Sequence, residues 1–347
     1  MKKRHPLIEL LLCRFRQFYR EPDAVFWTYV FPLLMIVGLG IAFRNRPPDR
    51  VAVDVAESVG AADVVSALSA AADGGFDVRT TAPALAAERL RLGKTAIVVD
   101  AGPDGYEYRY DPTRPESLLA RTRVDDALQR AAGRVDPASV RDRHVTEPGS
   151  RYIDFLVPGL LGLNLMGGGL WGIGFITVEM RVRKLLKRLV ASPMRRSDLL
   201  LSLVGGRMLF TAPETAVILG AGVLFFHIVI AGSLWSVVVV VLVGGASFTG
   251  IGLLLASRAA RLETVIGLIN VLILPMWLFS GVFFSYERFP AVVHPWIRLL
   301  PLTQLNDALR AVILEGRPLV SQWFALTYLS VLGVVCFFLA LRVFRWN

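Results

Sequence analysis

The sequence is poor in the residues and motifs that most catalytic and metal-binding sites require. Among 347 residues it has two cysteines, Cys13 and Cys336, and the stretch 44–151 has none. That stretch therefore offers neither a disulfide framework nor a cysteine-based metal site. The GxxxxGK[ST] phosphate loop of P-loop ATPases occurs nowhere in the sequence. We predict that the chain has no catalytic, cofactor-binding or metal site of its own and does not hydrolyse ATP.

Charged residues are missing from several long stretches. The composition is 54% hydrophobic and the mean hydropathy is +0.54, which is too apolar for an ordinary soluble domain. The uncharged stretches are Ala24–Phe43, Phe155–Val178, Thr215–Ser257, Thr264–Tyr286 and Pro318–Leu341. About 20 apolar residues cross a bilayer core. The stretch from Thr215 is 43 residues long, so we divide it near His227–Ser233 and start its first half around Met208. This division predicts six transmembrane helices.

The net charge of +10 is concentrated beside these apolar stretches. Residues 44–151 carry 16 basic and 17 acidic side chains, whereas the rest of the chain carries 22 basic and 11 acidic ones. The basic excess therefore indicates membrane topology rather than nucleic-acid binding. With the amino terminus inside, 17 basic residues fall on cytoplasmic pieces and only Arg288, Arg298, Arg310 and Arg317 on short outer connections. We expect a multi-pass protein of the plasma (inner) membrane with both termini in the cytoplasm.

Residues 44–150 have the pattern of a separate α/β domain. Strands are predicted at 51–57, 75–81, 95–100 and 106–110, and helices at 62–72, 83–93 and 115–133. The acids of this domain and His144 show no ligand or catalytic spacing, so we expect them to form a solvated surface. The predicted fold class is an α-helical polytopic membrane protein with six transmembrane helices and an inserted small α/β extracytoplasmic domain. The predicted domains are a cytoplasmic amphipathic interface helix (1–22), a first span (23–43), the extracytoplasmic domain (44–150) and a five-span core (151–347).

The cytoplasmic segment 179–202 is basic and amphipathic. Residues 178–203 hold seven Lys or Arg against two acids. Val182, Leu185, Leu186, Leu189 and Val190 recur with helical spacing, and Pro193 is expected to end the helix. We predict a short helix in this segment, between the second and third spans.

Four polar residues of the predicted spans are candidates for a transport path: Glu214, Asn164, Thr249 and Asn270. Glu214 follows Arg207 by seven residues, or two helical turns. A carboxylate inside the membrane is by default a functional-site hypothesis. The alternative is structural: Glu214 pairs with Arg207, and hydrogen bonds between helices account for the other three residues.

Small residues and prolines mark two further features. Glycine is dense in the second and fourth predicted spans, which indicates close backbone packing, either between helices of one chain or across a dimer seam. The outer connection 283–316 is too apolar for a free loop and too interrupted for a span. We predict short helices there that dip back into the outer leaflet.

Three stretches resemble the type-2 ABC exporter permeases, the ABC-2 transporters, in the drug- and lipid-exporting branch that has a large extracytoplasmic domain. The first is Glu179…Leu189…Ser192-Pro193, similar to the coupling helix of that family. The others are Ser280-Gly281-Val282-Phe283-Phe284 followed by Pro290, and Pro301-Leu302-Thr303 with Arg310 seven residues after Thr303, similar to its outer re-entrant helices. The interface helix and the six spans extend the resemblance over nearly all of the chain. Lys184-Leu185-Leu186 stands where the family usually has a Gly-Thr pair.

The resemblance implies roles for two sets of residues. The ATPase-coupling set is Glu179, Arg181, Arg183, Lys184, Leu185, Leu186, Lys187, Arg188, Leu189, Ser192 and Pro193. The outer re-entrant set is Ser280, Gly281, Pro290, Pro301 and Arg310.

The resemblance also implies the partners of the chain. They are a separate P-loop ATPase in two copies, which carries the ATP and Mg, a second permease chain in a homodimer, and membrane lipid. The cargo would be an amphipathic or hydrophobic substrate, such as a drug, a lipid or a lipid-linked glycan, moved out of the cytoplasm or the inner leaflet.

Two other functions remain open at this point. A proton-coupled secondary carrier could use Glu214, and it would show internal inverted repeats, of which the sequence gives no convincing sign. A membrane-anchored sensor could instead bind a ligand through residues 44–150, but it would need neither a cytoplasmic coupling helix nor a broken outer connection.

Overall fold

The computed structural model describes residues 12, 15–16, 18–42, 50–71, 75–102, 105–135, 151–190 and 196–344. The chain divides into two compact units, Asn45–Val145 and the remainder, Met1–Arg44 with Thr146–Asn347. Most of the predicted interface helix (1–22) lies outside the described residues, as do His144, Ser192 and Pro193.

The unit Asn45–Val145 is a small α/β domain with one mixed sheet. Its elements are β1 (Val51–Ala56), α4 (Ala61–Ala70), β2 (Phe76–Thr81), α5 (Pro83–Arg91), β3 (Ile97–Gly102), β4 (Gly105–Arg109) and α6 (Pro115–Ala131). The strand order is β2-β1-β3-β4, with β4 antiparallel to β3 and the other pairs parallel. These elements coincide with the strands and helices predicted from the sequence pattern, apart from a few residues at their ends.

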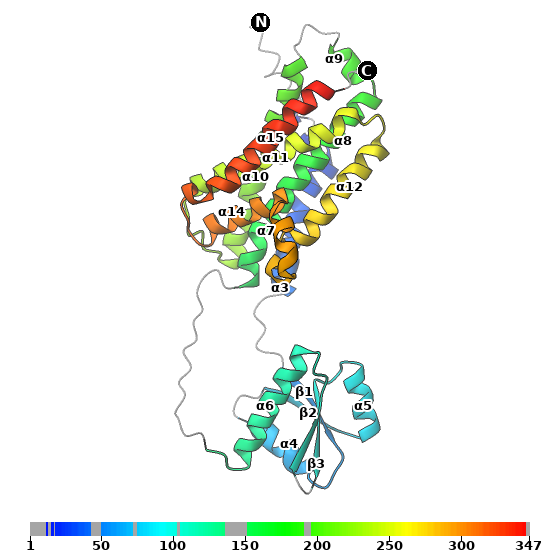
Figure 1. Ribbon diagram of the computed structural model, residues 1–347, viewed down its shortest axis with the longest axis vertical. Coiled ribbons are helices and arrows are strands. Elements are labelled where there is room, and N and C mark those ends of the chain that lie inside the picture. Colours follow the sequence, from blue (N-terminus) through cyan, green and yellow to red (C-terminus); the bar gives the residue numbers. More distant parts are fainter. Residues whose placement is uncertain are drawn as a thin grey trace. The chain divides into compact units, whose positions relative to one another are not determined.

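The two faces of this sheet are covered differently. Helices α4 and α6 lie on one face, where Val53 and Val55 contribute to the core, and α5 lies on the other (Figure 1). On the α5 face, Ala56 and Val98 pack with Ala86. Strand residues alternate between the faces, so the hydrophobic alternation of β1 builds both layers.

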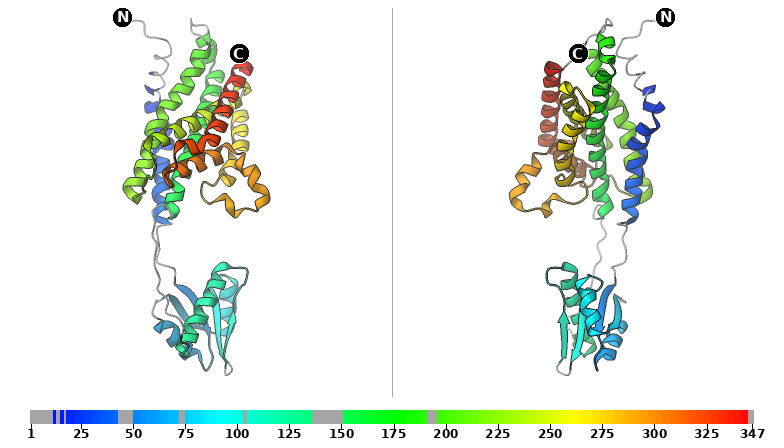
Figure 2. Two further views of the ribbon diagram at one scale, coloured as in Figure 1. Left: turned by 60° about the vertical axis from the view of Figure 1, so that its left-hand side comes forward. Right: turned by 90° about the vertical axis from the view of Figure 1, so that its right-hand side faces the viewer.

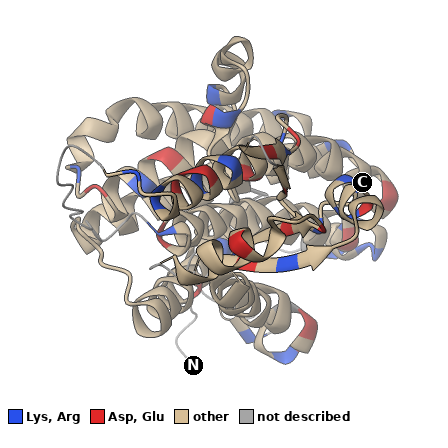
Figure 3. Cartoon of the chain, turned by 90° about the horizontal axis from the view of Figure 1, so that it is seen from below, with Lys and Arg blue, Asp and Glu red and all other residues tan. Residues whose placement is uncertain are grey.

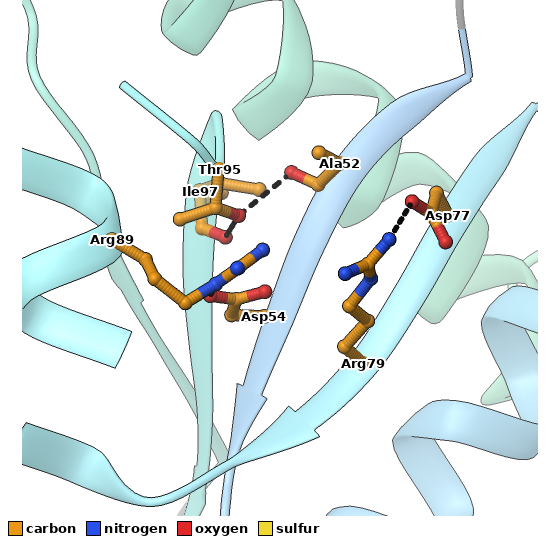
Figure 4. Close-up of polar contacts among 7 residues, drawn as sticks. All are labelled: Ala52, Asp54, Asp77, Arg79, Arg89, Thr95 and Ile97. Atoms are coloured by element: carbon orange, nitrogen blue, oxygen red, sulfur yellow. Dashed lines mark hydrogen bonds and ion pairs between the residues drawn. The ribbon is translucent and has the colours of Figure 1, made fainter. Parts of the chain in front are cut away.

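An ion pair neutralises the one acid that β1 buries. The side chain of Asp54 is 1% exposed, and Nε of Arg89 on α5 donates to its Oδ2 at 2.6 Å (Figure 4). That hydrogen bond is the main cause that raises the pKa of Arg89 above its usual value. A buried carboxylate is tolerated only when it is paired. Elsewhere on the domain, charges of both signs alternate over the helices and strands (Figure 3).

Replacing Arg89 by methionine should destabilise the α/β domain. The Arg89→Met variant leaves Asp54 buried without its partner, so we expect the melting temperature of the segment 45–145 to fall by roughly 5–10 °C. The control is Arg91→Met, two residues away at an exposed position. Thermal unfolding followed by circular dichroism compares the two variants. Equal melting temperatures would contradict the stabilising role of the ion pair between Arg89 and Asp54.

The second unit is a helical bundle. Its first stretch is continuous through α2 (Pro22–Val25), the π-helix η1 (Phe26–Val30) and α3 (Phe31–Ala42). Its second stretch runs through α7 (Tyr152–Gly167), the π-helix η2 (Gly168–Gly172) and α8 (Ile173–Val182). The remaining elements are α9 (Leu185–Val190), α10 (Arg196–Phe226), α11 (Leu234–Arg258), α12 (Leu262–Phe279), η3 (Tyr286–Arg288), η4 (Ala291–Val293), α13 (His294–Arg298), α14 (Pro301–Ile313), η5 (Leu319–Gln322) and α15 (Trp323–Val343).

Five helical stretches of the described chain are long and apolar enough to cross a membrane. They are Tyr152–Val182, Asp198–Phe226, Leu234–Arg258, Leu262–Phe279 and Leu319–Val343. The first predicted span appears as the shorter apolar stretch Phe26–Ala42. A sixth crossing therefore stays a prediction.

The third predicted span differs from expectation at one end. The break inside the uncharged stretch is confirmed, because α10 ends at Phe226 and α11 begins at Leu234. Helix α10 begins at Arg196, however, well before the start expected around Met208. Leu199 and Leu200 are fully buried in this added part, so packing extends the helix beyond its apolar run.

The connections of the bundle gather at two ends. Helix α9 and the C-terminal ends of α8, α11 and α15 lie at one end (Figure 1). At the other end, the backbone N–H of Ala231 donates to the carbonyl of Ile313, and Nη2 of Arg151 donates to that of His227. The described basic residues of α8 and α9 and of the C-terminal ends of α11 and α15 thus share one end of the bundle. Which side of the membrane that end faces remains a prediction.

Helices α11 and α15 pack at backbone contact through glycines. A Cβ on Gly250 would lie 2.6 Å from the carbonyl oxygen of Gly333, and one on Gly333 would lie 2.8 Å from Cα of Ser247. Neither neighbour can move without shifting a helix backbone. The small residues of α11 therefore serve close packing, as their density in the sequence predicts.

A larger side chain at Gly250 should separate these two helices. We expect Gly250→Val to lower the stability of the full chain in detergent by about 1–3 kcal/mol. The matched control is Gly267→Val on α12, where an added Cβ meets no atom within 4 Å. Fluorescence-detected gel filtration after heating compares the two variants. A Gly250 variant as stable as the Gly267 variant would argue against close packing of α11 and α15 at Gly250.

Candidate transport cavity and coupling segment

A cavity of about 880 Å³ lies within the helical bundle, and its lining is mostly apolar. Residues from α3, α7, α8, α10 and α12 and from both π-helices line it. Trp27 on η1 and Trp277 on α12 also line it while being 61% and 49% exposed, so the cavity is open on their side. Its size and apolar walls suit a small hydrophobic or amphipathic molecule.

An ion pair on α10 forms one polar part of the cavity wall. Nη2 of Arg207 lies 2.8 Å from Oε2 of Glu214, and the two side chains are 8% and 1% exposed. Both residues line the cavity. The pairing that the sequence offered as the structural alternative for Glu214 is therefore present, and it places the pair on the wall of the cavity.

A glycine makes room for this arginine. A Cβ on Gly168 would lie only 1.9 Å from Nη2 of Arg207, so the guanidinium rests directly on the backbone of η2. Both π-helices contribute to the cavity, η1 through Trp27 and Thr28 and η2 through Gly168 and Trp171. Single π-turns inside α-helices frequently mark functional sites, because the wider turn displaces side chains from the regular register.

The structure gathers three of the four candidates for the transport path. Asn164, Glu214 and Asn270 all line the cavity, from α7, α10 and α12. Nδ2 of Asn164 donates to the carbonyl of Thr28 at 3.3 Å, which joins α7 to η1. Thr249 lies elsewhere: it is fully buried, and its hydroxyl donates to the carbonyl of Gly245 one turn earlier on α11.

Sequence reasoning missed most of the cavity wall. Trp27, Trp171 and Trp277 come from three different helical stretches, and no spacing in the sequence connects them. The one available signal was the glycine run from Gly167 to Gly169, which spans the end of α7 and the start of η2.

The described part of the interface segment borders the same cavity. Phe18 lines it and stacks on Phe210 of α10, with the ring centroids 4.3 Å apart. The ring of Tyr29 on η1 meets Phe18 edge-on at 5.9 Å. Since Phe210 follows Arg207 by less than one turn, these aromatic rings connect the interface segment to the part of α10 that carries the ion pair.

The predicted coupling segment is broken at its start. Helix α8 ends at Val182, Lys184 has a φ of 58°, and α9 begins at Leu185. The short helix is therefore present, but it begins at Leu185, and Val182, which the sequence pattern places in it, ends α8 instead. A positive φ at lysine is uncommon, and the sequence gives no sign of it.

The coupling residues divide into exposed and buried groups. Oε1 of Glu179 lies 2.8 Å from Nη2 of Arg183, which is 69% exposed, and Arg188 is exposed as well. Leu185 is 38% exposed, whereas Leu186 is 1% exposed in a core with residues of α8, α10 and α15. Leu186 thus packs inside the chain, and the side chains of Lys187 and Leu189 lie outside the described part.

Arg181 binds the end of another helix. Its guanidinium donates to the carbonyls of Ala256 at 2.8 Å and Ser257 at 3.0 Å, and also to that of Ala259. It also lies 5.1 Å from the ring centroid of Phe344. The last carbonyls of a helix have no partner within that helix, and a cation there is favourable. Arg181 therefore joins α8 to α11 and to the end of α15.

Substitutions should distinguish the contribution of Arg181 to stability from that of Arg183. We expect Arg181→Gln to lower the stability of the full chain in detergent by about 1.5–3 kcal/mol, because carbonyls at the end of α11 lose a charged donor. Arg183→Gln removes an exposed i,i+4 pair and should cost about 0.5 kcal/mol or less. Thermal unfolding of both variants is the measurement, and a similar loss for both would contradict the assignment.

The outer set of residues is joined to α7. Pro290 precedes η4 in the lobe of short helices that projects beside the bundle (Figure 2), and Pro301 begins α14, which is buried in the bundle. Arg310 on α14 donates to the carbonyls of Gly281 and Phe155 and lies 3.6 Å from the ring centroid of Phe155. The carbonyl of Ser280 accepts from Nδ2 of Asn306 at 3.0 Å. Gly281 has a φ of 68°, which favours glycine.

Comparison with known proteins gives the family. The family described as "ABC-2 family transporter protein" matches residues 23–342. The chain is 26% identical over 202 residues to ABC transporter G family member 20 of Dictyostelium discoideum, covering 58% of this chain and 27% of that protein. It is 22% identical over 203 residues to the probable multidrug ABC transporter permease YbhR of Escherichia coli K12, covering 58% and 55%. It is 24% identical over 202 residues to nodulation protein J of Rhizobium meliloti, covering 57% and 75%.

The chain thus spans about a quarter of the length of the first relative and about half of the length of the second. The family match, in contrast, extends from the first predicted span to the last. It also takes in the coupling segment and the residues of the cavity wall from Asp23 onward. The chain therefore belongs to the ABC-2 family, the membrane permease subunits of ABC transporters.

Proposed function

We propose that this chain is the permease subunit of an ATP-driven exporter that moves an amphipathic or hydrophobic molecule out of the cytoplasm or the inner leaflet. The observation that carries the proposal is the cavity of about 880 Å³, which combines apolar walls with one buried ion pair. A path for a purely polar solute would need more hydrogen-bonding groups than this lining provides.

A separate P-loop ATPase would supply the energy. It would bind in two copies to a homodimer of this chain, and it would carry the ATP and Mg. The half-buried Glu179, the exposed Arg183 and Arg188, and the exposed Leu185 would form its docking surface on each permease. All four belong to the end of the bundle that the charge distribution assigns to the cytoplasm.

The geometry offers a direct route from this surface to the cavity. Helix α8 carries Glu179 near one end, and its other end continues into η2, which lines the cavity. The ten residues of α8 span about 15 Å. Movement of the docking surface would therefore shift η2 along its axis, together with Gly168 under the ion pair. Arg181 would carry the same movement to α11 and α15.

Charge reversal tests the docking surface. The tagged full-length chain is purified from its own cells, and the ATP hydrolysis of the purified sample is measured. We expect the wild type to bring down a P-loop ATPase, and the triple variant Glu179→Lys, Arg183→Glu, Arg188→Glu to recover at least fivefold less of it.

The control reverses an exposed ion pair at the opposite end of the bundle. Arg317 and Glu315 form such a pair, at 61% and 49% exposure, and Arg317→Glu with Glu315→Lys should leave ATPase recovery unchanged. Full ATPase recovery by the triple variant would contradict the docking surface. Transport driven by a pH gradient without ATP would instead favour a secondary carrier.

A further inference from the structure

Strand β2 forms one edge of the sheet in the α/β domain. Among the described strands it pairs with β1 alone, over its whole length and without a bulge. The carbonyl of Gly75 accepts from the first residue of β1, and that of Thr81 accepts from the residue after β1. Backbone groups alternate in direction along a strand, so the N–H and C=O groups of Phe76, Val78 and Thr80 point away from β1. Such a row at the edge of a sheet is a template for another strand.

We propose that β2 pairs antiparallel with β2 of a second copy of this chain, in a register centred on Val78. In this register Val78 lies opposite its own counterpart, and Phe76 lies opposite Thr80 of the second copy. All three residues present their N–H and C=O groups to the second copy, so each of these pairs exchanges two backbone hydrogen bonds. The proposal rests on the homodimer of the proposed function, and it gives that homodimer an interface through the α/β domain.

The charges of β2 are complementary to themselves in this register. Asp77 lies opposite Arg79 of the second copy, in a pair without backbone hydrogen bonds, where side chains lie closest. Within one chain, Nη2 of Arg79 lies 3.1 Å from Oδ2 of Asp77, and the two side chains are 59% and 51% exposed (Figure 4). The pairing keeps this contact and gives each charge a second neighbour of opposite sign. Opposite charges directly across two strands stabilise the pairing.

The same charges select one register. Centring the pairing on Asp77 would place the two aspartates opposite each other, and centring it on Arg79 would do the same with the two arginines. Like charges directly opposite are destabilising. The register centred on Val78 avoids both, and it also places the ring of Phe76, which packs against the core of the domain, beside the exposed Thr80 of the second copy. Aromatic and β-branched side chains are a favourable cross-strand pair.

Oxidation of an introduced cysteine tests the register in the full chain. Directly opposite residues of a hydrogen-bonded antiparallel pair have Cα atoms about 5.5 Å apart, which is within the range of a disulfide. We expect Val78→Cys, oxidised with copper phenanthroline in isolated membranes, to give at least fivefold more disulfide-linked dimer than the wild type on a non-reducing gel. The wild type, with Cys13 and Cys336, sets the background.

The matched control is Thr80→Cys, on the same face of β2 and exposed. In the proposed register two cysteines at this position are four residues apart along the strands, or about 14 Å, which is too far for a disulfide. We therefore expect Thr80→Cys to give no more dimer than the wild type.

Exchanging the charges tests the complementarity. In the Val78→Cys chain, Arg79→Asp places like charges opposite each other and should lower the yield of dimer at least fivefold. Adding Asp77→Arg restores opposite charges and should return the yield to within about twofold of its original value. Without the cysteine, hydrogen exchange of the β2 amides should show the same loss and recovery of protection, so the test does not depend on the folding of Val78→Cys.

The outcomes separate this interface from the export function. Equal yields of dimer from Val78→Cys and Thr80→Cys, or no recovery when both charges are exchanged, would overturn the paired edge even if the chain still recruits an ATPase. A dimer linked through Val78→Cys in a chain that recruits no ATPase would keep the paired edge and overturn the exporter.

Discussion

A buried arginine must find oxygen atoms to bind, and three arginines of the helical bundle meet this requirement at three different places. Arg181 binds carbonyls at the end of α11, Arg207 pairs with Glu214 on the cavity wall, and Arg310 binds the carbonyls of Gly281 and Phe155. A polar group left unpaired in an apolar interior costs several kcal/mol. Arg181 therefore fixes α8 against α11, and Arg310 fixes α14 against α7 and the residues that follow α12, whereas the pair of Arg207 and Glu214 stays on one helix.

Glycine gives two of these arginines the space they need. Gly168 lies under the guanidinium of Arg207, and a Cβ on Gly159 would lie 3.0 Å from Nη2 of Arg310. The same residue type brings α11 and α15 into backbone contact. The packing of the helices and the polar contacts of the arginines thus both depend on glycine. Helices in a membrane lack the hydrophobic driving force that would otherwise hold them together.

The cavity and the coupling segment are linked through this framework. Helix α8 leads from the exposed pair of Glu179 and Arg183 to η2, and η2 supports Arg207. The interface segment reaches the same part of α10 through Phe18 and Phe210. A movement at one end of the bundle therefore has two physical routes to the cavity, one along a helix axis and one through stacked rings.

The sequence by itself determined the elements. Periodicity predicted the strands and helices of the α/β domain, the absence of charge predicted the long helices, and the division before Leu234 is confirmed. The sequence could not predict two features. One is the early start of α10, which depends on packing of Leu199 and Leu200. The other is the positive φ of Lys184, which ends α8. The pairing of Glu214 with Arg207 could be foreseen because both lie on one helix. Only the tertiary structure decided that Trp27, Trp171 and Trp277 share one cavity and that Arg181 binds α11. Local patterns report which face of a segment is apolar, whereas contacts between distant segments depend on how the helices pack.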